Sequence, residues 1–160
     1  MKRILFLCHG NICRSPMAEA ILKEKLKLRK LDKDYYVSSR ALSNEEIGNI
    51  IYYKAKETLE KHHITSFSHI AVKFKGEDYE KFDYIFIMDK NNQRYIEQIM
   101  GTLTLPKVKL LGNYIKDGYE ISDPWYSRRF EQTYDEIDKA LDVFLKEELR
   151  WVMNKILKTF

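Results

Sequence analysis

The chain has 160 residues, of which 44% are hydrophobic and 32% charged, and it contains only two cysteines. These values indicate one soluble globular domain over residues 1–160 and exclude a disulfide framework. The net charge of +4 comes from 28 basic and 24 acidic residues that are largely interleaved, which favours a solvated surface and excludes a nucleic-acid partner.

The first half of the chain predicts two strand–helix units. Residues 2–8 form a short apolar run before a Gly-Asn turn signal, which is typical of a buried strand. The next helix is expected to have Ser15 as its N-cap, a proline in its first turn and apolar residues at helical spacing over residues 18–26. Residues 35–41 then predict a second strand, and residues 51–62 a second helix.

The second half continues the alternation. An apolar strand is expected at residues 83–88, a helix at about 90–100 and a short strand at 108–111. Residues 112–126 have the character of a loop, and a long helix follows from Phe130. Strands that alternate with helices predict an α/β fold, in which a four-stranded parallel sheet is flanked by helices.

Nothing in the chain resembles a targeting or membrane segment. The apolar part of the N-terminal segment is too short for a secretion signal, and no apolar run is long enough to cross a bilayer. We therefore expect a cytoplasmic protein without a membrane partner.

The segment Cys8–Ser15 lies between the first strand and the first helix, where ligands bind in such sheets. Gly10 allows a sharp turn, and Asn11 tolerates left-handed backbone angles. Consecutive N–H groups and the positive end of the helix then form a cradle for an anion. The segment matches neither the Walker A pattern nor the dinucleotide fingerprint.

A cysteine and an arginine give this cradle its chemistry. The helix dipole, the N–H groups and a guanidinium all favour the thiolate form of Cys8. Arg14 can hold two oxygens of a phosphate at once. This combination is typical of phosphoryl transfer to sulfur. An inert buried cysteine beside a surface arginine is the alternative, and the strand, turn and helix around the pair favour the functional interpretation.

Departure of an alkoxide or phenoxide also needs an acid. The stretch "SDPWYS" supplies Asp123, held extended by the following proline, with Trp125 and Tyr126 as an aromatic wall. An Asp-Pro pair by itself more often only starts a turn. Beside a cradle that has no acid of its own, Asp123 is the candidate proton donor.

The stretches "CHGNICRSPMAEA" and "DPWY" resemble the low-molecular-weight protein tyrosine phosphatases, and "VSSRAL", "FDYIFIMDKNNQRYI" and "VKLLGNY" extend the resemblance over nearly the whole chain. The resemblance implies a flavodoxin-like fold, hydrolysis through a phosphocysteine intermediate, and no metal or cofactor. It implies a phosphotyrosine-containing protein as substrate, with inorganic phosphate or another oxyanion as product or inhibitor. We expect a monomer or a weak dimer.

The resemblance also assigns roles to residues. Cys8 matches the nucleophile, Arg14 the phosphate clamp and Asp123 the general acid. The phosphate-binding loop then comprises His9, Gly10, Asn11, Ile12, Cys13, Arg14 and Ser15.

Four of the matched positions support this loop. Ser15 matches the hydroxyl that bonds the thiolate, and Asn11 the residue that holds the loop's shape. His69 and Asp89 match positions that support the loop from behind. Cys13 matches the neighbouring cysteine that traps an oxidised nucleophile as a disulfide.

Three positions depart from the family pattern. Glu45 stands where the substrate rim often has an aromatic residue, Val72 replaces an arginine that often follows His69, and His9 replaces a small or apolar residue. With Trp125 and Tyr126, Glu45 forms the expected substrate rim. These departures leave the substrate preference open.

Related activities remain as alternatives. Arsenate reductases of this fold pass oxidation through further cysteines, which a chain with two cysteines lacks. Arginine phosphatases of the family resemble "GNTCRS", whereas Ile12 stands at the threonine position here and suits a phenyl ring. A phosphotyrosine-binding module without turnover would have lost Cys8 or Asp123, and both are present.

Overall fold

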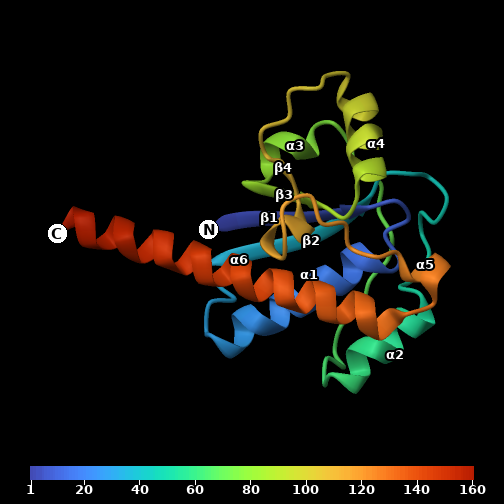
Figure 1. Ribbon diagram of the computed structural model, residues 1–160, viewed down its shortest axis with the longest axis horizontal. Coiled ribbons are helices and arrows are strands. Elements are labelled where there is room, and N and C mark those ends of the chain that lie inside the picture. Colours follow the sequence, from blue (N-terminus) through green and yellow to red (C-terminus); the bar gives the residue numbers. More distant parts are fainter.

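The computed structural model describes all 160 residues and shows a four-stranded sheet between two layers of helices (Figure 1). The strands are β1 (Lys2–Cys8), β2 (Tyr35–Ala41), β3 (Tyr84–Ile87) and β4 (Val108–Leu110), in the spatial order β2-β1-β3-β4. Every neighbouring pair is parallel. This is the strand order of flavodoxin-like sheets, so the predicted fold class is confirmed.

The helices divide between the two faces of the sheet (Figure 1). One face carries α1 (Arg14–Leu28) and α6 (Phe130–Thr159), with α2 (Tyr53–Lys61) packed beside both. The opposite side carries α3 (Asp78–Lys81) and α4 (Lys90–Met100). The short helices η1 (Leu111–Tyr114) and α5 (Pro124–Ser127) lie between β4 and α6. None of these helices combines the length and the apolar character needed to cross a membrane.

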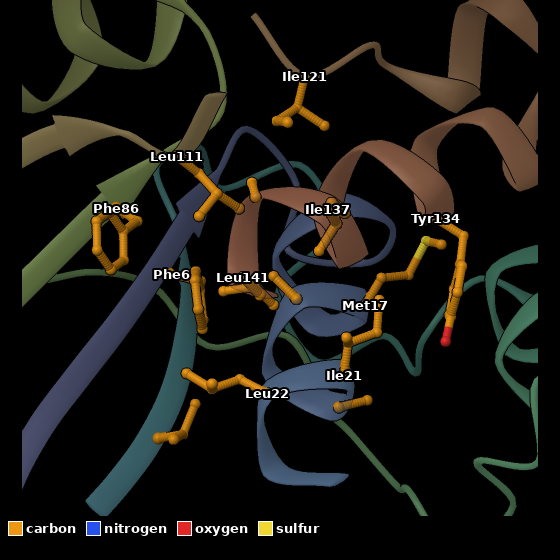
Figure 2. Packing of buried hydrophobic residues seen from close by; sticks show 14 of the residues in the cluster. Phe6, Met17, Ile21, Leu22, Phe86, Leu111, Ile121, Tyr134, Ile137 and Leu141 are labelled. Carbon is orange, nitrogen blue, oxygen red and sulfur yellow. The ribbon is translucent and has the colours of Figure 1, made fainter. Parts of the chain in front are cut away.

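The sequence of β1 explains why helices cover both faces. Ile4 and Phe6 belong to the larger apolar cluster, which β1 shares with α1 and α6, whereas Leu5 and Leu7 belong to the smaller cluster on the opposite face. Figure 2 shows Phe6 among side chains of α1 and α6. Each such buried side chain stabilises the fold by about 1.5–3 kcal/mol. The loop after β1 therefore starts from a firmly fixed strand.

Apart from single-residue differences at the ends of β3 and β4, the predicted elements agree with the structure except in four places. The prediction of Ser15 as an N-cap is wrong, because α1 already begins at Arg14 and Ser15 is buried within its first turn. The second helix is shorter than residues 51–62. The segment 112–126 is not only loop, since η1 and α5 form within it. The four-residue α3 was not predicted because it is too short to show a helical period.

Candidate active site

The loop after β1 begins where the winding of the sheet reverses. The chain passes from β1 to β2 on one side of β1 and then crosses to β3 on its other side, which makes the end of β1 the switch point at which such sheets bind ligands. Cys8 ends β1, and α1 begins at Arg14. Between them Asn11 has a φ of 61°, a left-handed conformation that asparagine tolerates. The predicted turn is therefore present.

Several backbone N–H groups of this loop donate to no acceptor of the protein. They belong to Gly10, Ile12, Cys13, Arg14 and Ser15. Those of α1 are unpaired because the first turn of a helix has no intrahelical acceptors. Together with the positive end of the helix, these donors can bind an anion.

The sulfur of Cys8 lies at the base of this loop and is only 3% exposed. Its Sγ atom is 2.9 Å from the hydroxyl oxygen of Ser15, and it accepts the backbone N–H of Asn11 at 3.3 Å. These two contacts hold the sulfur in place at the base of the loop, where a cysteine can act as a nucleophile. Because Ser15 lies within the helix, its hydroxyl is free for this contact.

Asn11 ties the loop to the neighbouring strand and to the segment before α3. Its side chain is fully buried and donates to Ser15 Oγ at 2.8 Å and to Ser39 Oγ at 3.0 Å, while its Oδ1 accepts the N–H of Val72 at 3.1 Å. Its carbonyl oxygen lies 2.8 Å from Nε2 of His69. This distance requires the proton of His69 on Nε2. The side chain of His69 therefore contacts the backbone of the loop from the segment before α3.

Arg14 is 3% exposed and is bonded to acidic side chains from two other parts of the chain. Its Nη1 donates to Asp89 Oδ2 at 2.7 Å and to the carbonyl oxygen of Ile121 at 3.1 Å, and its Nη2 lies 3.3 Å from Asp123 Oδ2. Burial alone would lower the pKa of Arg14. The charges of Cys8, Asp123 and Asp89 outweigh burial and raise it.

These bonds orient the guanidinium and leave two of its N–H groups unused. Of the five N–H groups of Arg14, the Nε–H and one Nη2–H are not engaged. Two free N–H groups of one guanidinium can bind two oxygens of a phosphate.

Both acidic partners of Arg14 are N-caps of helices. Asp89 caps α4, where its Oδ1 accepts the N–H of Asn92 at 2.8 Å. Asp123 caps α5, where its Oδ1 accepts the N–H of Trp125 at 3.0 Å. Each carboxylate is thus fixed through one oxygen while the other faces Arg14.

The predicted loop and rim residues, except Ser15, meet in one cavity of about 170 Å³. Its walls are formed by Cys8, His9, Gly10, Asn11, Ile12, Cys13, Arg14, Glu45, Glu46, Asp123, Trp125 and Tyr126. Ser15, His69 and Asp89 are outside the cavity and contact the residues that line it.

On the rim of the cavity, His9 Nε2 lies 3.1 Å from Glu45 Oε2. Two of the three departures from the family pattern, His9 and Glu45, are therefore partners in the structure. A cysteine, a guanidinium and a carboxylic acid around a small anion-sized cavity can carry out phosphoryl transfer.

A family model described as low molecular weight phosphotyrosine protein phosphatase matches residues 3–154. The chain belongs to this family. The low molecular weight phosphotyrosine protein phosphatase of Gallus gallus is 35% identical over 152 residues, which cover 92% of this chain and 96% of the relative.

Two solved structures extend the comparison. YfkJ from Bacillus subtilis has a TM-score of 0.86 at 28% identity, covering 94% of this chain and 96% of that chain. The Drosophila arginine phosphatase has a TM-score of 0.82 at 35% identity, covering 92% and 98%. The chain is thus similar to one relative named for phosphotyrosine and to one structure named an arginine phosphatase.

Two contacts of this family member lay outside the prediction. Glu46 lines the cavity and lies over Gly10, where an added Cβ would be 3.2 Å from Glu46 Cγ. Tyr52 donates its N–H to the carbonyl oxygen of Ile12 at 2.9 Å and so fixes the start of α2 to the phosphate loop. Neither contact has a sequence motif, although Glu46 adjoins the predicted rim residue Glu45.

Cys13 is a free thiol and only 6% exposed. Burial and the neighbouring charges of Cys8 and Asp123 raise the pKa of Cys13 far above its ordinary value. The two cysteines of this phosphatase therefore differ in environment, since only Cys8 has donors at its sulfur.

Proposed function

We propose that this protein hydrolyses phosphotyrosine in proteins through a phosphocysteine intermediate at Cys8. The observation that carries the proposal is the buried Cys8 sulfur, held by two donors at the base of a loop of unpaired N–H groups. Membership of the family supports it.

Binding of the phosphate uses two sets of donors. The dianion accepts hydrogen bonds from the unpaired loop N–H groups, which place phosphorus above the Cys8 sulfur. The unused Nε–H and Nη2–H of Arg14 bind two further oxygens. These donors stabilise the charge of the transition state and already have their geometry before the substrate arrives.

The first chemical step forms a bond between Cys8 Sγ and phosphorus and breaks the bond between phosphorus and the phenolic oxygen. Asp123 acts as general acid and donates its proton to that oxygen. In the second step water attacks phosphorus, Asp123 takes up a proton, and the Cys8 thiolate leaves. The products are tyrosine and inorganic phosphate, and the steps require no metal ion or cofactor.

The cavity walls favour an aromatic substrate. Ile12, Trp125 and Tyr126 line the space above the phosphate loop and offer apolar contact to a phenyl ring. A phosphoserine side chain is too short to bring phosphorus past these residues to the sulfur.

Phosphoarginine is the second candidate substrate, since a similar structure is named an arginine phosphatase. Ile12 disfavours it because an isoleucine offers a guanidinium no hydrogen bond. We also propose that the protein acts in the cytoplasm as a monomer or a weak dimer.

The test compares phosphotyrosine, phosphoserine and phosphoarginine peptides of one sequence, in the presence of a chelator. We expect the highest kcat/KM for phosphotyrosine by a wide margin. The matched control is Cys8→Ser, which removes the nucleophile and keeps the loop N–H groups, so it is expected to bind phosphate without turnover. Substantial turnover by Cys8→Ser would exclude the phosphocysteine, and a preference for phosphoarginine would replace the proposed substrate.

A further inference from the structure

A second hollow adjoins the phosphate cavity. It has a volume of about 350 Å³ and shares Ile12, Glu46 and Trp125 with that cavity. Its other walls come from residues 49–53, the segment that leads into α2. We call this hollow, lined by Ile12, Glu46, residues 49–53 and Trp125, the side groove. Since the two hollows share walls, a substrate bound in one can extend into the other.

The side groove presents apolar side chains to solvent. Ile50 is 71% exposed, Tyr53 58% and Trp125 45%. Single exposed apolar residues are common, but three around one hollow beside a candidate active site are typical of a binding surface. Six of the eight lining residues are hydrophobic, so the groove suits an apolar occupant.

The groove is held rigidly against the phosphate loop. The N–H of Tyr52 donates to Ile12, and the rings of Tyr52 and Trp125 pack at 5.0 Å between centroids. Arg128 donates to the hydroxyl of Tyr52 at 2.8 Å. A preformed groove at a fixed distance from the reacting atom costs little ordering when a substrate binds.

The far end of the groove is fixed in the same way. Ile50 forms an antiparallel bridge with Ile70, and the N–H of Ala71 donates to the carbonyl oxygen of Asn49 at 2.8 Å. Ile50 therefore presents its side chain from a backbone that is paired on one side.

Charge at the boundary between the hollows restricts the occupant further. Glu46 is the only charged residue of the side groove and accepts a hydrogen bond from Asn49 Nδ2 at 2.6 Å, and Glu45 lies next to it on the rim. Two carboxylates at this boundary disfavour an acidic residue beside the phosphorylated one.

We propose that the side groove binds one large apolar side chain of the substrate protein, from a residue within a few positions of the phosphotyrosine. This inference rests on the proposed function, because the phosphorylated residue must occupy the cavity. The continuity of the two hollows through Ile12, Glu46 and Trp125 identifies the occupant as part of the same peptide. The groove thus selects among phosphotyrosine sites by their flanking sequence.

The test uses phosphotyrosine peptides in which one leucine, alanine or aspartate is moved from position −3 to +3 relative to the phosphotyrosine. We expect leucine at one favoured position to raise kcat/KM about tenfold over alanine, mainly through KM, which corresponds to about 1.4 kcal/mol. Aspartate at that position is expected to be the poorest substrate.

The variants Ile50→Ser and Tyr53→Ser locate the effect. Both are expected to abolish the preference for leucine and to leave the turnover of p-nitrophenyl phosphate, which has no flanking residues, unchanged. The control Ile156→Ser alters an equally apolar exposed side chain on α6 and is expected to keep the preference.

Three results would overturn the inference. Leucine could equal alanine at every position, or Ile50→Ser could retain the preference. Ile50→Ser could also change the oligomeric state in gel filtration while the peptide preference stays, which would assign the groove to a second copy of this chain. Failure of the proposed function would look different, since every phosphotyrosine peptide would then be a poor substrate, whatever its flanking residues.

Discussion

Replacing Asn11 by alanine tests how the phosphate loop is held. Asn11 is fully buried, and its side chain takes part in three hydrogen bonds, with Ser15, Ser39 and Val72. The variant removes all three and leaves the N–H of Val72 without its acceptor. It also places alanine at a φ of 61°, where a Cβ is unfavourable unless the side chain compensates.

The expected cost follows from these contacts. Each lost hydrogen bond contributes about 1 kcal/mol, and the left-handed conformation adds about 1 kcal/mol for alanine. We therefore expect the free energy of unfolding to fall by about 3–4 kcal/mol. For a chain of this length this corresponds to a decrease in Tm of roughly 6–16 °C. Activity is expected to fall as well, because Asn11 orients the hydroxyl that contacts the Cys8 sulfur.

Urea unfolding followed by circular dichroism measures this loss. The variant Asn11→Gly separates strain from hydrogen bonding, because glycine adopts positive φ freely, and we expect it to be about 1 kcal/mol more stable than Asn11→Ala. Asn154→Ala, at an exposed asparagine of α6, controls for the substitution itself. A loss below about 1 kcal/mol for Asn11→Ala, or equal stability of the glycine and alanine variants, would refute this reasoning.

The remaining predictions concern the acid, the second cysteine, the apolar wall and the supporting histidine. Asp123→Asn is expected to lower kcat about 10²–10⁴-fold on phenyl phosphate and much less on an ester of a very acidic phenol, whereas equal losses would indicate a structural role. Burial raises the pKa of Cys13, so only a small fraction of it is thiolate, and that fraction grows about tenfold with each unit by which the pH rises. The disulfide between Cys13 and peroxide-oxidised Cys8 is therefore expected to form roughly tenfold faster per pH unit, and mass spectrometry measures its formation. In Cys13→Ser, recovery by thiols is expected to be lost. Ile12→Thr is expected to shift the ratio of kcat/KM for phosphotyrosine and phosphoarginine peptides by about 1–3 kcal/mol towards phosphoarginine. Burial lowers the pKa of His69 in the folded protein below 6.5, its ordinary value in the unfolded chain. As the pH falls below about 6.5, the unfolded chain therefore binds this proton more readily than the folded protein, and the folded protein loses stability. Urea unfolding at pH 7 and pH 5 measures this loss of stability, which is expected to be smaller in His69→Gln than in the unchanged protein. An equal loss in both proteins would show that His69 does not cause it.

The sequence by itself predicted the elements whose signals are local. The bounds of β1 and β2 were predicted without error, because short runs of strand-forming residues end there at residues that favour turns. The cradle from Cys8 to Arg14 is likewise contained in seven consecutive residues, so the order of its residue types already indicates its chemistry. Asp123 was proposed from its own loop and from the chemistry that the cradle lacked.

Only the tertiary structure decided which distant residues act together. Arg14 bonds Asp89 and Asp123, which lie 75 and 109 positions further along the chain, and the order of the strands brings them to one edge of the sheet. No local pattern encodes that order, because it depends on how all four strands and their helices bury apolar surface together. The position of Ser15 likewise could not be predicted from its local sequence. Its sequence neighbours predicted a helix cap, whereas α1 starts two residues earlier, with Cys13 at the N-cap position, and the Ser15 hydroxyl contacts the Cys8 sulfur.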